Sequence, residues 1–197
     1  YRKYFGSLCE VPFINMSTLT NIADDTVKLS VKSWIEKVVV GLNFCPFAKK
    51  EMERNTIRYA IFPATQVKDA LSNLLEELSL LDQLQDIQTT LLIFPQGFSV
   101  FDDFLDMLEM ANTLIGQGGY RSIYQLASFH PDYCFDGEEQ NDPANYTNRS
   151  PYPILHILRE RSVETVLKRY PQPESIPENN IAKARELGSS FLKALLK

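Results

Sequence analysis

The sequence predicts an α/β fold: a single domain with a mixed, mainly parallel sheet of about four strands and helices packed on its faces. Short apolar runs of strand length alternate with longer segments whose apolar residues recur at helical spacing. Two strand-like runs end in Ile-Phe-Pro, at Pro63 and Pro95, and a helical segment follows each. The 197 residues are 44% hydrophobic and 23% charged, a composition typical of globular proteins rather than disordered or membrane proteins.

The N-terminal part of the chain is predicted to be helical. Apolar residues follow one helical face over residues 25–42, and Asp24 or Asp25 can cap the start of this helix. A second, short helix is expected to begin at Pro46, because proline suits the first helical position.

Four strands and the helices that connect them follow. The strands are predicted over residues 57–62, 89–94, 122–129 and 153–159. The helices are predicted after the cap Thr65, over 101–115, from Ser162 and over 177–196. The polar segment 132–152, between the last two strands, is long enough to suggest a functional role.

The chain is expected to be a cytoplasmic protein that does not enter a membrane. Residues 1–15 are predicted to be a non-native or disordered leader outside the domain of residues 16–197, because Met16 begins a run that resembles a natural start. Their apolar stretch is too short for a signal peptide. The longest charge-free run, 87–101, is too short and too polar to span a bilayer.

Cysteine usage and charge exclude several classes of protein. Cys9, Cys45 and Cys134 are an odd number without CxxC spacing, which argues against a disulfide framework or a zinc ribbon. The net charge is −5 and no Lys/Arg block is present, so a nucleic-acid partner is not expected. Glycine-rich nucleotide-binding motifs are absent. The sequence identifies no cofactor and no oligomeric state, whereas the basic residues of 144–197 suit one small anion.

A site is predicted where the third strand ends and the fourth begins. Ligands of parallel sheets bind outside the carboxyl ends of strands. The third strand ends at His130 and the fourth begins just after Arg149, so antiparallel pairing would place these ends side by side. His130 is the preferred acid/base, because imidazole titrates near neutrality. The alternative is a histidine that orders the loop through a backbone hydrogen bond.

Arg149 is the strongest candidate for an anion contact, because its planar guanidinium matches a carboxylate or phosphate. Asn148 and Ser150 would add neutral donors, and Arg159 is a further candidate. His156, inside an apolar strand, either positions a ligand or packs in the core. In the alternative reading, Arg149 only pins the loop by pairing with Asp136 or Asp142.

Cys45 is a candidate nucleophile. It precedes Pro46 at an expected helix start, where the helix dipole and free N–H groups lower the pKa of a thiol. A histidine would have to act as its base. The alternative is a cysteine that packs between two helices. The histidines and nearby aspartates are metal-ligand types, but no tight ligand spacing supports a metal site, and none is predicted.

Several of these segments resemble one family. They are CPFA (45–48), FHPDY (129–133), NYTNRSPYP (145–153), LH (155–156) and LRE (158–160). Over residues 25–190 the chain is similar to an uncharacterised bacterial family, the domain of unknown function 1415. The resemblance implies a small, soluble, stand-alone bacterial protein, and it implies no activity.

The predicted function is binding of a small carboxylate- or phosphate-bearing molecule at the FHP and TNRSPYP segments, with acid/base catalysis left open. The alternative is a non-enzymatic adaptor whose long loop presents Tyr133, Tyr146 and Tyr152 to a protein partner, since tyrosine is enriched in binding hot spots.

Overall fold

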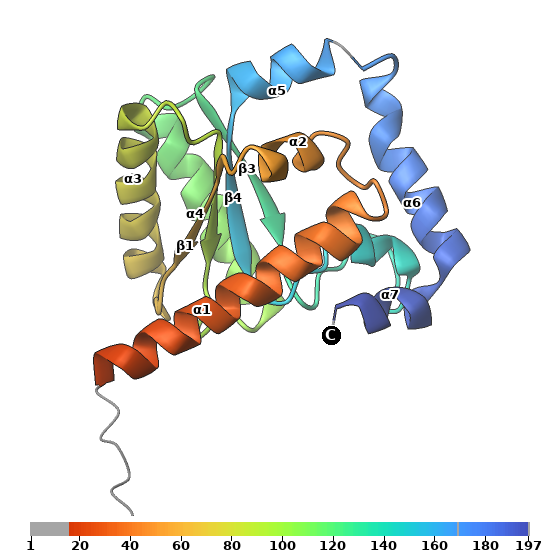
Figure 1. Cartoon of the computed structure of the whole chain (residues 1–197), viewed down its shortest axis with the longest axis horizontal. Coiled ribbons are helices and arrows are strands. Elements are labelled where there is room, and N and C mark those ends of the chain that lie inside the picture. The colour runs from red at the N-terminus through yellow and green to blue at the C-terminus, as the bar shows by residue number, and fades with distance from the viewer. Residues whose placement is uncertain (1–15, 169, 197) are drawn as a thin grey trace, which may run out of the picture.

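The structure is a computed structural model that describes residues 16–168 and 170–196 (Figure 1). The leader predicted for residues 1–15, with Cys9, lies outside the described residues. Four strands form one sheet: β1 (Ile57–Ile61), β2 (Thr89–Ile93), β3 (Tyr124–Phe129) and β4 (Ile154–Arg159). Each strand begins and ends within two residues of its predicted bounds.

The helices also follow the predicted order. They are α1 (Met16–Trp34), α2 (Ala48–Glu53), α3 (Val67–Gln83), α4 (Phe101–Gln117), α5 (Glu160–Leu167), α6 (Ile176–Leu187) and α7 (Ser189–Leu195). A π-helical turn, η1 (Ile35–Val40), continues α1, and η2 (Pro143–Thr147) and η3 (Pro173–Ser175) are 3₁₀ turns. The predicted C-terminal helix is two helices, because Gly188 with φ of 80° interrupts it.

The sheet is mixed, as predicted, but the expectation that it is mainly parallel is wrong. Its order is β1-β2-β4-β3, with β1 and β2 parallel and with β4 antiparallel to both of its neighbours. A parallel return from β3 would need a crossover connection, usually a helix. The segment between β3 and β4 has only the short turn η2, so β4 returns antiparallel between β2 and β3.

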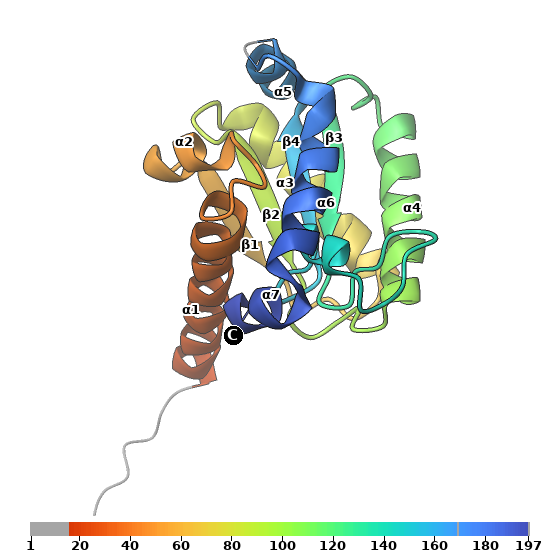
Figure 2. The ribbon, with the colours of Figure 1, turned by 90° about the vertical axis from the view of Figure 1, so that its right-hand side faces the viewer.

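Helices cover the two faces of the sheet differently. On one face α3 and α4 pack against alternate side chains of the strands, among them Leu155 and Ile157 of β4. On the other face α1, η1, α6 and α7 pack against a second set, among them Ile154 (Figure 2). All five residues of β2 are buried, as expected for a central strand covered on both sides.

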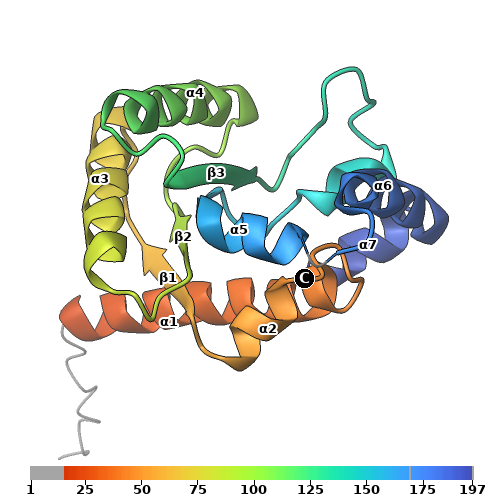
Figure 3. The same ribbon diagram turned by 90° about the horizontal axis from the view of Figure 1, so that it is seen from above.

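The short helices α2 and α5 lie on the same side of the sheet as α1, opposite α4 (Figure 3). The part of this face formed by β3 and β4 is therefore covered by short elements rather than by one long helix. In the described part of the chain, none of the helices is both long and apolar enough to cross a membrane.

Candidate functional site

The ends of β3 and β4 lie side by side, as the sequence predicts. The N–H of His130 donates to the carbonyl of Asn148 (3.2 Å), and the N–H of Ser150 donates to the carbonyl of His130 (3.4 Å). The FHP and TNRSPYP segments are thus neighbours.

His130 occupies a closed position in this region. Its side chain is 0% exposed, and the rings of Phe101 and Phe104 lie 5.1 and 5.2 Å away. The N–H of Asp132 donates to Nδ1 (3.0 Å), so Nε2 of the neutral ring carries the proton and donates to the carbonyl of Phe98 (2.9 Å). Burial lowers the pKa of His130, which favours this neutral form. Both ring nitrogens therefore make hydrogen bonds to the backbone, which matches the alternative that His130 orders the loop.

Arg149 is directed into the loop that precedes it in the chain. Its Nε donates to the carbonyl of Tyr133 (3.1 Å) and its Nη2 to the carbonyl of Gln140 (2.6 Å). The guanidinium lies over the ring of Tyr146. Arg149 therefore holds the loop, as the loop-pinning alternative expects, but its partners are backbone carbonyls rather than Asp136 or Asp142.

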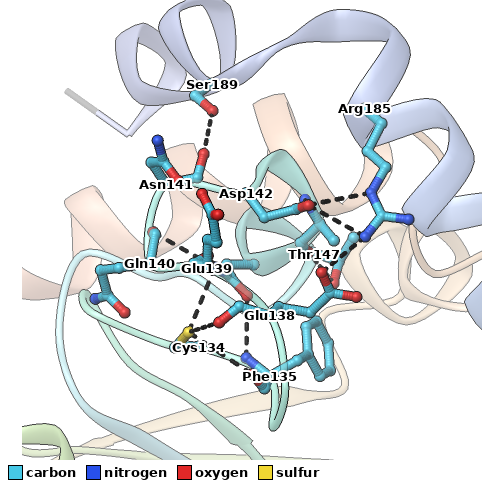
Figure 4. Close-up of polar contacts among 12 residues, drawn as sticks. Cys134, Phe135, Glu138, Glu139, Gln140, Asn141, Asp142, Thr147, Arg185 and Ser189 are labelled. Atoms are coloured by element: carbon cyan, nitrogen blue, oxygen red, sulfur yellow. Dashed lines mark hydrogen bonds and ion pairs between the residues drawn. The ribbon is translucent and has the colours of Figure 1, made fainter.

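Asp142 pairs instead with α6. Arg185 donates to Asp142 (3.1 Å) and Glu138 (2.9 Å), and the hydroxyl of Ser189 donates to the carbonyl of Asn141 (Figure 4). The hydrogen bond from Arg185 is the largest cause of the lowered pKa of Asp142. The long polar loop is therefore fastened to α6 and α7.

Three more predicted ligand-binding residues make hydrogen bonds within the protein. Asn148 donates to the carbonyl of Ser128 (3.2 Å), and the hydroxyl of Ser150 donates to the carbonyl of Tyr152 (2.6 Å). The guanidinium of Arg159 donates to the carbonyls of Leu81, Leu84 and Ile87, at the end of α3 and beyond it, and to the hydroxyl of Tyr124. The three side chains act here as connections between segments.

The adaptor alternative requires exposed tyrosines. Tyr146 is buried, and Tyr133 and Tyr152 are half-buried. The loop therefore presents none of them as a fully exposed side chain.

His156 lies on the opposite face of the sheet from His130. Side chains alternate along β4, and His156 shares its face with Ile154, which packs with α1, whereas His130 packs against α4. The hypothesis that His130, Arg149 and His156 line one pocket is therefore wrong.

His156 instead lines a cavity of about 290 Å³ together with Cys45. The cavity lies between the sheet, the end of α1, α2 and α5. Its walls are mainly apolar, and the apolar side chains that line it include Trp34, Ile35, Val39, Phe47, Leu91, Ala127, Phe129, Leu158, Val163 and Val166. The polar lining residues besides Cys45 and His156 are Glu51, Gln88, Thr89, Gln125, Arg159 and Ser162. Cys45 and His156 are separate candidates in the sequence, and the fold places both of them on one cavity.

Thr89 fixes the state of the His156 ring. Its single hydroxyl proton has two close neighbours, the carbonyl of Ile157 (2.6 Å) and Nε2 of His156 (2.6 Å). When the hydroxyl donates to Ile157, it accepts from Nε2–H, and both contacts are satisfied. Nδ1 then carries a lone pair, and it has no hydrogen-bond partner among the described residues. Burial lowers the pKa of His156 to about 4, so the ring is neutral at physiological pH.

The loop that carries Cys45 is held by the π-helical turn. The carbonyl of Val39 accepts from the N–H groups of both Phe44 (2.9 Å) and Cys45 (3.3 Å). From α6, Asn180 donates to the carbonyl of Phe44 (2.6 Å). π-helical turns are frequent at functional sites, and this one places Cys45 against the cavity.

The pKa of Cys45 is raised rather than lowered. Burial is the largest cause, and the N–H groups of Phe47 and Ala48, which lie against the sulfur, oppose it. The expected effect of the helix start is therefore present but smaller than desolvation. Cys45 is a protonated thiol near neutral pH.

Trp34 and Thr89 are cavity residues that the sequence analysis missed. The Trp34 ring packs edge-on against Phe129, with centroids 5.1 Å apart, and its indole N–H is buried without a partner in the described residues. The two threonines that begin an otherwise apolar strand were a signal for Thr89. Trp34 gave no signal beyond its place on the apolar face of a helix. Among the described residues, no three His, Cys, Asp or Glu side chains are grouped as metal ligands.

The chain is thus an α/β protein with a mixed sheet and an apolar cavity on one face. It belongs to the family described as Protein of unknown function (DUF1415), whose model matches residues 26–194. No curated protein and no solved structure gives a significant match.

Proposed function

We propose that the protein binds a small, neutral, mainly apolar molecule in the cavity lined by Cys45 and His156, and that the molecule donates one hydrogen bond to Nδ1 of His156. The observation that carries the proposal is an apolar cavity lined by His156, whose ring makes its hydrogen bond through Nε2 and has none at Nδ1 among the described residues. Small-molecule sites commonly combine apolar walls with a few placed polar groups. The volume, about 290 Å³, suits a small ligand.

The charges around the cavity favour a neutral ligand over an anion. His156 is neutral there, the guanidinium of Arg159 is engaged at the end of α3, and the lining includes the carboxylate of Glu51. A carboxylate or phosphate in the cavity would lose its hydration, and Arg159, the one cation among the described lining residues, already donates to backbone carbonyls. The anion site predicted at the strand ends remains a separate prediction, and its test on Arg149 is described below.

Three probes of similar size test the proposal: phenol, anisole and benzoate. Phenol has the donor, anisole lacks it, and benzoate is charged. In NMR titrations we expect phenol to bind with about threefold to tenfold higher affinity than anisole, the value of one neutral hydrogen bond. His156→Leu removes the Nδ1 acceptor and leaves Thr89 its hydrogen bond to Ile157, so it should abolish this preference and leave anisole binding unchanged.

A cavity-filling variant tests the location. Val163→Trp on α5 should eliminate phenol binding, because Val163 lines the cavity and the larger tryptophan side chain would fill it. Glu164→Trp, on the exposed side of the same helix, is the matched control and should bind as wild type does. Phenol binding that survives in Val163→Trp, or benzoate binding that exceeds phenol binding, would show the proposal to be wrong.

A further inference from the structure

We propose that Cys45 accepts an acyl group from an apolar acyl thioester bound in the cavity, and that Nδ1 of His156 takes the thiol proton. This inference rests on the proposed function, since the thioester must first occupy the same cavity. The cavity brings together a thiol and an imidazole from distant segments of the chain. A nucleophile, a base and a group that orients the base are the arrangement typical of nucleophilic catalysis.

Cys45 needs a base because it is protonated. Thiolate is the nucleophilic form of cysteine, and burial disfavours it here. His156 lines the same cavity, and its Nδ1 is an acceptor with no hydrogen-bond partner among the described residues. The hydrogen bond between Nε2 and Thr89 keeps the proton of the neutral ring on Nε2 and so keeps Nδ1 free.

The backbone next to Cys45 assists the same step. The N–H groups of Phe47 and Ala48 lie against the sulfur and favour its ionised form. In the described part of the chain, no hydrogen bond joins the thiol of Cys45 to His156. Such contacts often form only when substrate is bound.

The reaction is an exchange of thioesters and needs no further reactant. The sulfur of Cys45 attacks the acyl carbon while its proton passes to Nδ1 of His156. A carbon–sulfur bond to Cys45 forms, and the carbon–sulfur bond to the donor thiol breaks. The proton then passes from His156 to the departing thiolate. The products are an acylated Cys45 and a free thiol.

The cavity walls define the class of substrate. Phe47, Phe129, Leu158 and Val163 offer apolar contacts to an aliphatic or aromatic acyl group. Arg159, the cation among the described lining residues, donates to backbone carbonyls at the end of α3, which favours an uncharged thioester near the sulfur. We expect an acyl group of small or medium size because of the limited volume.

The test uses the hexanoyl thioester of N-acetylcysteamine, a neutral donor, and intact-protein mass spectrometry. Wild type should gain one hexanoyl group, located on Cys45 by peptide mapping and released by hydroxylamine. Cys134→Ser is the matched control and should react as wild type does, since Cys134 lies in the polar loop and donates to backbone carbonyls. Cys45→Ala should not react.

Two further variants separate His156 and the cavity from simple thiol exposure. His156→Gln should slow acylation about a hundredfold, as expected for the loss of a general base. Anisole binding measures whether its cavity is intact. Val163→Trp should block acylation although it leaves both reacting groups in place. Acylation of Cys134 at the rate of Cys45, or an unchanged rate in His156→Gln, would overturn the inference.

The two proposals fail in different ways. If phenol binds as expected but Cys45 is not acylated, the inference is wrong and the proposed function stands. If Val163→Trp changes neither phenol binding nor the rate of acylation, neither compound enters the cavity, and both proposals are wrong.

Discussion

Arg149 is stacked on Tyr146, with the guanidinium carbon 4.5 Å from the centroid of the ring. Arg149 is also hydrogen-bonded to two carbonyls of the loop it closes. Arg149 therefore holds the loop in two ways: the plane of its guanidinium stacks on Tyr146, and the N–H groups at its edge donate to the carbonyls. This geometry suits arginine far better than lysine.

Arg149→Ala should destabilise the protein by about 1–3 kcal/mol, because two partly buried hydrogen bonds from a charged donor to loop carbonyls are lost. Arg149→Lys should recover only part of this loss. Urea denaturation measures both variants, and phenol binding should be unchanged in the folded proteins. The anion prediction is tested in parallel by calorimetry with phosphate and acetate. Anion binding that weakens about tenfold in Arg149→Ala would support the site predicted from the sequence.

The stability of the protein should depend on pH through His156. Its pKa is about 4 in the folded protein, below its ordinary value, so the unfolded chain binds a proton first as the pH falls. The stabilising contribution is present above about pH 6.5 and is lost as the pH falls toward about 4. We expect the stability difference between wild type and His156→Gln to shrink by about 2 kcal/mol from about pH 7.5 to about pH 5. A constant difference would contradict the low pKa.

Arg58 and Glu77 join β1 to α3 through a bidentate ion pair, with distances of 2.7 and 2.8 Å. The side chain of Glu77 is 4% exposed, so Arg58→Met leaves a buried carboxylate without a cation. We expect a loss of about 2–3 kcal/mol in urea denaturation, since Arg58 is partly exposed. Adding Glu77→Leu should restore most of it. The exposed pair of Lys168 and Glu164 is the control, and Lys168→Ala should change stability by less than about 0.5 kcal/mol.

Two glycines should respond to alanine with opposite signs. A Cβ on Gly97 would lie 2.2 Å from the backbone carbonyl oxygen of Ala64, so Gly97→Ala should destabilise by about 1–3 kcal/mol. Gly116 lies inside α4 with only a side-chain atom of Arg121 nearby, at 3.6 Å. Gly116→Ala should therefore stabilise by about 0.5–1 kcal/mol, because alanine favours the helix. Thermal melts of the two variants compare the effects directly.

The sequence predicts the elements of this fold well because each one has a local signal. The apolar periodicity of α3 and α4 and the apolar run of β2 are visible without tertiary information. Strand direction is not local, because it depends on which strands pair. The conditional expectation of an antiparallel fourth strand is confirmed, and the overall expectation of a mainly parallel sheet is wrong.

The candidate site was less predictable than the fold. Cys45 and His156 stand out individually in the sequence, but a cavity arises where surrounding side chains fail to fill space. No residue pattern records that property. His130 and His156 flank the same loop in sequence, and only the side of the sheet on which each packs separates them. Arg149 has polar neighbours that suit an anion, yet backbone carbonyls take up its donors.

The π-helical turn of residues 35–40 makes chain length, as well as side-chain identity, a determinant of the cavity. A π-helical turn holds one residue more than an α-helical turn, so deletion of the exposed Lys37 would allow a regular α-helix. Everything after the turn would keep its rotational phase relative to α1, because a regular turn replaces the wide one, but the hydrogen bonds of this segment would join residues four rather than five apart. Val39 would then no longer present its carbonyl to Cys45. Members of the family that are one residue shorter here are therefore expected to retain the sheet but lose this wall of the cavity.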